Sequence, residues 1–192
     1  MTRKYVPGLL VVDVQKDFCL GGSLAVKNGD LVVPPLNKVI RFFDKNDWPI
    51  FFSRDWHPSD TEHFKKWPPH CIENTPGAEF HSELLIPGRS YIVTKGTSKK
   101  DDGYSPFEGM AYKVKLETFL RAFRVNQLFI GGLATDYCVK AAAFDARALD
   151  FRTYLILDAC RGVNLNPFDS NKAIVEMKDV GVVMTTTDEI LR

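Results

Sequence analysis

Residues 128–138 read LFIGGLATDYC, an apolar run that passes through two glycines into a cysteine, after which small residues follow. The pattern predicts a buried strand that leads into a helix beginning at Cys138. A thiol at a helix N-terminus meets the positive end of the helix dipole and free backbone N–H groups, which favour the thiolate. Cys138 is therefore a candidate nucleophile, although cysteine is also common as a small buried hydrophobic residue.

The rest of the chain repeats this alternation of apolar strands and helical patterns. Continuously apolar strands are typical of parallel sheets buried on both faces, and the helices between them cover the sheet. We therefore predict an α/β three-layer sandwich, with a six-stranded, mostly parallel sheet flanked by helices. The predicted strands are 9–12, 50–52, 91–93, 128–130, 154–157 and 182–184, and the predicted helices are 31–43, 113–123, 139–149 and 171–178.

Composition limits the classes of protein to consider. The 192 residues are 45% hydrophobic and 26% charged, and the formal net charge is +1. These values fit a single globular domain over residues 1–192, and no block of like charge indicates a nucleic-acid or membrane surface. Asp13 interrupts the first apolar run, so we expect no signal peptide and a cytoplasmic location. The four cysteines show no CxxC spacing and are expected to be reduced thiols.

Reactive side chains follow four of the predicted strands. Asp13 and Asp55 come after the first two strands, and Lys95 and Cys138 come after the third and fourth. Ligands of open parallel sheets bind outside the carboxyl ends of the strands. Separate parts of the chain are therefore expected to deliver two carboxylates, an ammonium group and a thiol to one edge of the sheet.

Asp13, Lys95 and Cys138 form a set that can cleave an amide. The carboxylate can take the thiol proton and later return it to the departing amine, while the ammonium group favours the anionic forms of both neighbours. Attack of the sulfur on a carbonyl creates an oxyanion, which the backbone N–H groups of Ala134 and Cys138 can accept. Loss of the amine leaves a thioester, which water hydrolyses.

The long segment from residue 56 to residue 88 holds all four histidines. Connections of this length usually cover a site or carry ligands. Asp55 and His57 are two residues apart in an extended segment and can point to one side, and His63 and His70 approach from the loop. Imidazoles with a carboxylate suit one divalent metal ion, for which we expect zinc, with iron or manganese as alternatives. His81 is either a further ligand or a hydrogen-bonded structural residue.

Taken together, these motifs resemble the nicotinamidases of the isochorismatase-like cysteine hydrolase family. The resemblance is carried in order by VVDVQKDF at 11–18, DWHP at 55–58, WPPHC at 67–71, TKG at 94–96 and GLATDYCV at 132–139. It implies an isochorismatase-like fold and hydrolysis of nicotinamide to nicotinate and ammonia, a step of NAD salvage, with pyrazinamide as a side substrate. It also implies that the metal binds the pyridine nitrogen and orients the ring for attack by the thiol.

Carried over residue by residue, the resemblance assigns roles to particular positions. It implies a catalytic triad of Asp13, Lys95 and Cys138, and metal ligands Asp55, His57 and His70, with His63 matching a ligand of some members. It implies that Phe18, Trp67 and Tyr104 enclose the pyridine ring, that Leu133 and Ala134 also contact the substrate, and that the peptide between these last two residues is cis.

Three other interpretations stay open at this point. Another amidase of the superfamily, acting for example on carbamoyl substrates, would share the fold and the triad. A small-molecule binding protein would bind its ligand without releasing ammonia. A metal-bound hydroxide could replace the thiol as nucleophile, in which case Cys138→Ala would stay active and Asp55→Ala would be inactive. The sequence is compatible with a homo-oligomer.

Overall fold

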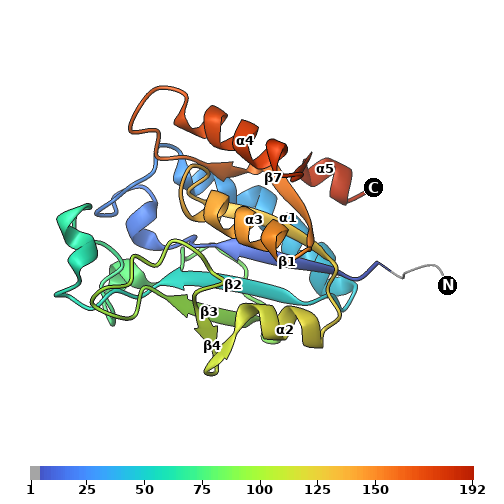
Figure 1. Ribbon diagram of the computed structural model, residues 1–192, viewed down its shortest axis with the longest axis horizontal. Coiled ribbons are helices and arrows are strands. Elements are labelled where there is room, and N and C mark those ends of the chain that lie inside the picture. The colour runs from blue at the N-terminus through green and yellow to red at the C-terminus, as the bar shows by residue number, and fades with distance from the viewer. Residues whose placement is uncertain (1–4) are drawn as a thin grey trace.

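The computed structural model describes residues 5–192, and its central feature is an eight-stranded sheet between two layers of helices (Figure 1). The strand order is β5-β4-β3-β2-β1-β6-β7-β8, and every neighbouring pair from β3 to β8 is parallel. The strands are β1 (Pro7–Val12), β2 (Ile50–Asp55), β3 (Tyr91–Lys95), β4 (Met110–Ala111), β5 (Val114–Lys115), β6 (Gln127–Leu133), β7 (Arg152–Arg161) and β8 (Val183–Thr185).

All six predicted strands are present, and the predicted three-layer α/β architecture is confirmed. The sheet has eight strands rather than six because β4 and β5 extend it beyond β3 as a small antiparallel hairpin. Each of these strands has two residues, which is too short for an apolar run to mark a strand in the sequence.

The helices are α1 (Val33–Lys45), α2 (Leu116–Ala122), α3 (Cys138–Ala148), α4 (Asp169–Asp179) and α5 (Thr187–Ile190). The predicted helix at 31–43 begins instead as a 3₁₀ turn, and the one at 113–123 loses its first residues to β5. Pro34 and Pro35 lie in the first turn of α1, where a missing N–H is tolerated. The unpredicted α5 is too short to show a helical period, and a capping box between Thr186 and Glu189 begins it.

Side chains of the central strand β1 alternate between the two faces of the sheet. Leu9 and Val11 belong to the core under α1, whereas Leu10 and Val12 belong to the core under α2, α3 and α4. All six residues of β1 are buried, which explains the continuous apolar sequence. The two cores together fix the carboxyl ends of the central strands relative to one another.

Two long connections, at residues 15–29 and 56–88, begin at the carboxyl ends of β1 and β2 (Figure 1). Gln15 ties them to the strand ends from a fully buried position. Its amide group donates to the carbonyls of Asp55 (2.8 Å) and Ala78 (2.9 Å), and its carbonyl accepts the N–H of Asp55 (2.7 Å). The buried loop backbone thereby finds the partners that it needs.

Gly132 lies where β6 passes close to β1. Its φ is +130°, and an added Cβ would lie 2.0 Å from the carbonyl oxygen of Val12. Backbone cannot give way as a flexible side chain does, so we expect Gly132→Ala to lower the free energy of unfolding by about 3 kcal/mol or more. Gly88→Ala is the matched control, because nothing lies within 4 Å of its added Cβ. Urea unfolding measures both, and equal midpoints would contradict the prediction.

Candidate active site

Three of the predicted side chains meet at the ammonium group of Lys95, which is itself the fourth predicted residue. Its Nζ lies 2.7 Å from Asp13 Oδ2, 2.5 Å from Asp55 Oδ1 and 3.6 Å from Cys138 Sγ. It also donates to the carbonyl of Gly103 at 2.5 Å. The two carboxylates and the ammonium group are at most 3% exposed. Buried charges need partners of this kind, and the ammonium group and the two carboxylates supply them to one another.

Each of these groups comes from the carboxyl end of a separate parallel strand. Asp13 follows β1, Asp55 and Lys95 end β2 and β3 as partners in the register, and Cys138 begins α3 after β6. Ser53 on β2 holds Asp13 in place, because its hydroxyl donates to Asp13 Oδ1 at 2.6 Å. The shared sheet edge expected from the sequence is therefore present.

Burial is the largest influence on proton affinity in this cluster. It raises the pKa of Asp13 to about 6, although Lys95 acts to lower it. It also raises the pKa of the Cys138 thiol well above its ordinary value, against the effect of Lys95. For Asp55, burial is outweighed by Lys95 and His57, so its pKa lies below the ordinary value. Burial thus favours the thiol of Cys138 over the thiolate expected at a helix N-terminus, and Asp13 lies close enough to take the thiol proton.

The backbone beside Cys138 offers two N–H groups to an oxyanion. Tyr137 and Val139 donate their N–H groups to the carbonyl of Ala134. Within residues 5–192, the N–H groups of Ala134 and Cys138 have no acceptor. The peptide between Leu133 and Ala134 is cis, as the resemblance implies. The use of these two N–H groups as oxyanion donors stays a prediction, with which the absence of an acceptor within the described residues agrees.

His57, His63 and His70 form a second cluster, in which one ring nitrogen of each lies within 4.8 Å of the others. The loop between His63 and His70 is short, but it allows both rings to reach this cluster. The Nδ1 atom of each ring faces an acceptor: Gly96 O for His57 (3.1 Å), Asp102 Oδ1 for His63 (2.9 Å) and Pro68 O for His70 (2.7 Å). A ring that donates Nδ1–H in this way keeps its Nε2 lone pair for a metal ion.

This second cluster fits a divalent cation. Within the described residues, Nε2 of His57 is buried and has no hydrogen-bond partner. Asp55 joins the two clusters, because one of its oxygens accepts from Lys95 and the other lies 3.8 Å from His57 Nε2. Three imidazoles and a carboxylate oxygen are a ligand set that zinc, iron and manganese all accept. The three histidines are thus placed where one ion could bind them, and Asp55 approaches this cluster at His57.

A cavity lies beside both clusters and has aromatic walls. Phe18, Trp67, Tyr104 and Ala134 line it, as do Cys138, Asp55, His63 and His70. The indole N–H of Trp67 donates to the Tyr104 hydroxyl at 3.1 Å, which braces these two rings against each other. The Leu133 side chain is absent from the lining, because it packs in the core under α1.

Sequence reasoning missed four residues that line this cavity: Leu24, Asp102, Tyr137 and Val163. Tyr137 packs edge to face against Trp67, with ring centroids 4.9 Å apart. Its position directly before the candidate nucleophile was an available signal. Leu24, Asp102 and Val163 lie in loops without periodic pattern, and only the fold brings them to the site.

His81 lies in a different cluster, with Cys19 and Asp30. Its Nδ1 accepts the N–H of Glu83 at 3.2 Å, and its Nε2 lies 3.3 Å from Asp30 Oδ1. Because Nδ1 accepts this N–H, the ring proton sits on Nε2, and neither nitrogen keeps a free lone pair for a metal ion. Of the two interpretations of His81, the structure therefore favours the hydrogen-bonded structural residue over the further metal ligand. All four cysteines are free thiols.

Comparison with known proteins identifies the class. Residues 7–189 match the isochorismatase domain, so the chain belongs to the isochorismatase family. The nicotinamidase of Escherichia coli (strain K12) is 36% identical to it over 199 residues, which is 93% of each chain. The crystal structure of the pyrazinamidase of Pyrococcus horikoshii in complex with zinc has a TM-score of 0.86 and 38% identity, covering 94% of this chain and 98% of that one.

A further solved relative is PnC1 from L. infantum, crystallised in complex with nicotinate. It is 30% identical, with a TM-score of 0.83, and covers 95% of this chain and 93% of its own. The nicotinamidase and the pyrazinamidase named above are thus similar to this protein over almost the whole chain. No helix formed by residues 5–192 has the length and apolar character needed to cross a membrane.

Proposed function

We propose that the protein is a metal-dependent nicotinamidase, which hydrolyses nicotinamide to nicotinate and ammonia through a thioester on Cys138. The observation that carries this proposal is one cavity lined by a thiol, two imidazoles and aromatic rings, with the third imidazole of the cluster, His57, next to those two. The similarity to a pyrazinamidase crystallised with zinc and to a protein crystallised with nicotinate supports it. The reaction belongs to NAD salvage, and pyrazinamide, which carries the same carboxamide on a diazine ring, is an expected side substrate.

Asp13 takes the thiol proton of Cys138 as the sulfur attacks the carboxamide carbon. The N–H groups of Ala134 and Cys138 hold the oxyanion of the tetrahedral intermediate. Lys95 stays protonated, since burial lowers its pKa but Asp13 and Asp55 raise it further, and its charge offsets the negative charge nearby. Asp13 then returns the proton to the amide nitrogen, and ammonia leaves a thioester behind. In the second half, Asp13 takes a proton from the attacking water, the C–S bond breaks, and the proton returns to the sulfur.

The metal ion would be held by Asp55, His57, His63 and His70, and zinc is the expected ion. When bound, it supplies a Lewis acid that accepts the lone pair of the ring nitrogen and fixes the orientation of the ring. Phe18, Trp67 and Tyr104 enclose the flat ring, which gains buried area and favourable ring contacts from such walls. The carboxamide is then held against the Cys138 thiol at attack distance.

Ammonia release from nicotinamide and from benzamide tests this proposal. Benzamide carries the same carboxamide on a ring that lacks the nitrogen. We expect the zinc-loaded protein to hydrolyse nicotinamide with a kcat/KM at least roughly 100-fold higher, because benzamide leaves the ring-nitrogen site unpaired. We also expect removal of zinc by chelation to abolish the preference. A folded, zinc-loaded protein that does not hydrolyse nicotinamide would contradict the proposal.

A further inference from the structure

The three histidines differ in what fixes their rings. Nδ1 of His57 and Nδ1 of His70 face backbone carbonyls, which no side-chain substitution removes. Nδ1 of His63 faces the carboxylate of Asp102, 2.9 Å away and 39 positions later in the chain. His63 is therefore the one ring of this cluster whose orientation depends on a single side chain.

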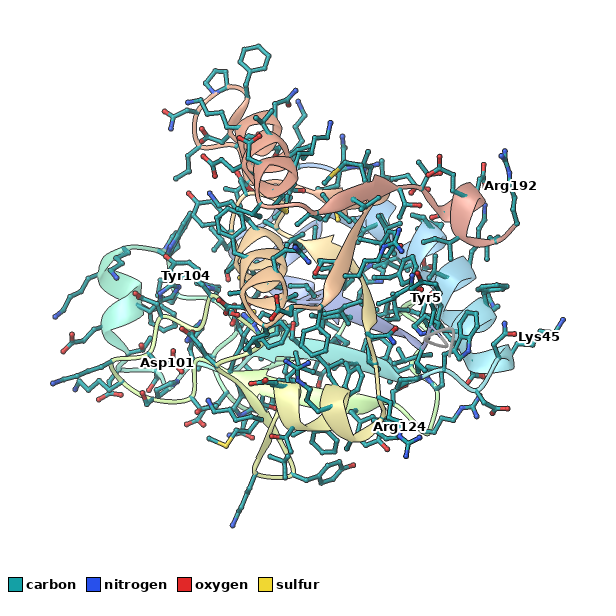
Figure 2. The ribbon with its side chains drawn as sticks, turned by 45° about the vertical axis from the view of Figure 1, so that its right-hand side comes forward. Tyr5, Lys45, Asp101, Tyr104, Arg124 and Arg192 are labelled. Carbon is teal, nitrogen blue, oxygen red and sulfur yellow. The ribbon has the colours of Figure 1, made fainter. Side chains whose placement is uncertain are left out.

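Asp102 also connects two loops at the edge of the cavity. His63 lies in the short 3₁₀ turn Glu62–Lys65, and Asp102 lies in the loop after β3. Figure 2 shows the labelled Asp101 and Tyr104, which flank Asp102, on the loop beside that turn. The second oxygen of Asp102 accepts from Lys66 at 2.7 Å, and Lys66 is more than half exposed. One carboxylate thus makes a partly buried contact with a histidine and an exposed contact with a lysine.

These two contacts have different expected effects on a bound metal. A carboxylate that accepts Nδ1–H fixes the tautomer of the imidazole, aims its Nε2 and raises the basicity of that atom. The exposed ion pair to Lys66 contributes little, because solvent screens it. The contact with His63 is therefore the one through which Asp102 acts on the metal site.

We propose that Asp102 is the positioning residue that brings His63 into the metal site as its fourth ligand. The proposal rests on the metal-dependent function proposed above, but it concerns metal affinity rather than turnover. It also gives His63 coordination a physical basis: with Nδ1 held by Asp102, Nε2 is the nitrogen left to bind a metal ion together with His57 and His70.

Zinc affinity of the metal-free protein, measured by competition with a chromogenic chelator, tests the proposal. We expect Asp102→Ala to weaken zinc binding roughly 10- to 100-fold. Asp102→Asn should lose less, because its amide oxygen can still accept from Nδ1. In His63→Ala, the further change Asp102→Ala should have no additional effect, because Asp102 acts through that ring. Lys66→Ala is the matched control and should bind zinc like the wild type.

Three results would overturn the proposal: wild-type zinc affinity in Asp102→Ala, independent losses in the double variant, or an equal loss in Lys66→Ala. The melting temperature of each metal-free variant checks folding, and Asp102→Asn decides the matter if Asp102→Ala does not fold. Nicotinamide turnover separates the two proposals. Turnover by the wild type with unchanged zinc affinity in Asp102→Ala overturns only the role of Asp102, whereas weakened zinc binding without wild-type turnover overturns only the proposed function.

Discussion

Cys138→Ala is expected to slow ammonia release from nicotinamide by at least roughly 10⁴-fold while the protein keeps its zinc. Without the sulfur, only substrate binding and the oxyanion donors remain. In enzymes with a nucleophilic side chain, these two contributions account for a small part of the rate enhancement. Zinc should be retained, because the histidine cluster does not include the thiol. Ammonia release and metal content are measured on the same preparation.

Cys160→Ala is the matched control for this variant. Cys160 is also a buried free thiol, at the end of β7, but it does not line the candidate active site. Its removal should leave turnover unchanged. Turnover by Cys138→Ala, together with an inactive Asp55→Ala, would identify a metal-bound hydroxide as the nucleophile and reject the thioester route.

The fold was largely predictable because buried parallel strands leave a strong signal. A strand covered on both faces has to be apolar at every position, as β1 is, and the helices between such strands carry an amphipathic pattern. The hairpin of β4 and β5 and the one-turn helix α5 gave no such signal, since each spans only about one period of its own pattern and a repeat cannot show. Tertiary contacts and caps, rather than periodicity, define elements of this length.

The candidate site likewise contains residues that the sequence predicts and residues that it does not. Asp13, Asp55, Lys95 and Cys138 were predictable because strand ends in a parallel sheet converge on one edge. Asp102 and Gln15 were not, because their roles arise from contacts with residues about 40 positions away or more. A supporting residue in a loop has no local pattern, so its partner becomes known only when the loop is placed.

Asp55 lies between the cluster around Lys95 and the histidine cluster. Because Lys95 pairs with Asp55 as well as with Asp13, both clusters depend on Lys95. The ammonium group lies between the carboxylate that faces the thiol and the carboxylate that faces the histidines. It lowers the pKa of both Asp13 and Asp55 against the effect of burial. Removing it would leave two carboxylates buried side by side without a cation in the metal-free protein.

Lys95→Met is therefore expected to lower the free energy of unfolding of the metal-free protein by roughly 3–5 kcal/mol, the cost of breaking a buried ion pair from one side. Turnover should fall by at least roughly 10³-fold, because the pKa of Asp13 rises and the protonated acid cannot take the thiol proton. Lys140→Met is the matched control. Lys140 pairs with Glu176 at 3.1 Å on the surface, where the loss should stay below about 1 kcal/mol.

The pH dependence of unfolding distinguishes this electrostatic cause from a packing defect. Without Lys95, both carboxylates bind protons more tightly in the folded state than in the unfolded chain. A group with a raised folded pKa stabilises the fold below its unfolded pKa, which is 3.8 for Asp13, and this stabilisation is lost as the pH rises through the folded value. The deficit of Lys95→Met relative to wild type should therefore be larger at about pH 8 than at about pH 5. A deficit that is equal at both pH values would point to lost packing of the lysine side chain and contradict the view that this ammonium group holds the two carboxylates together.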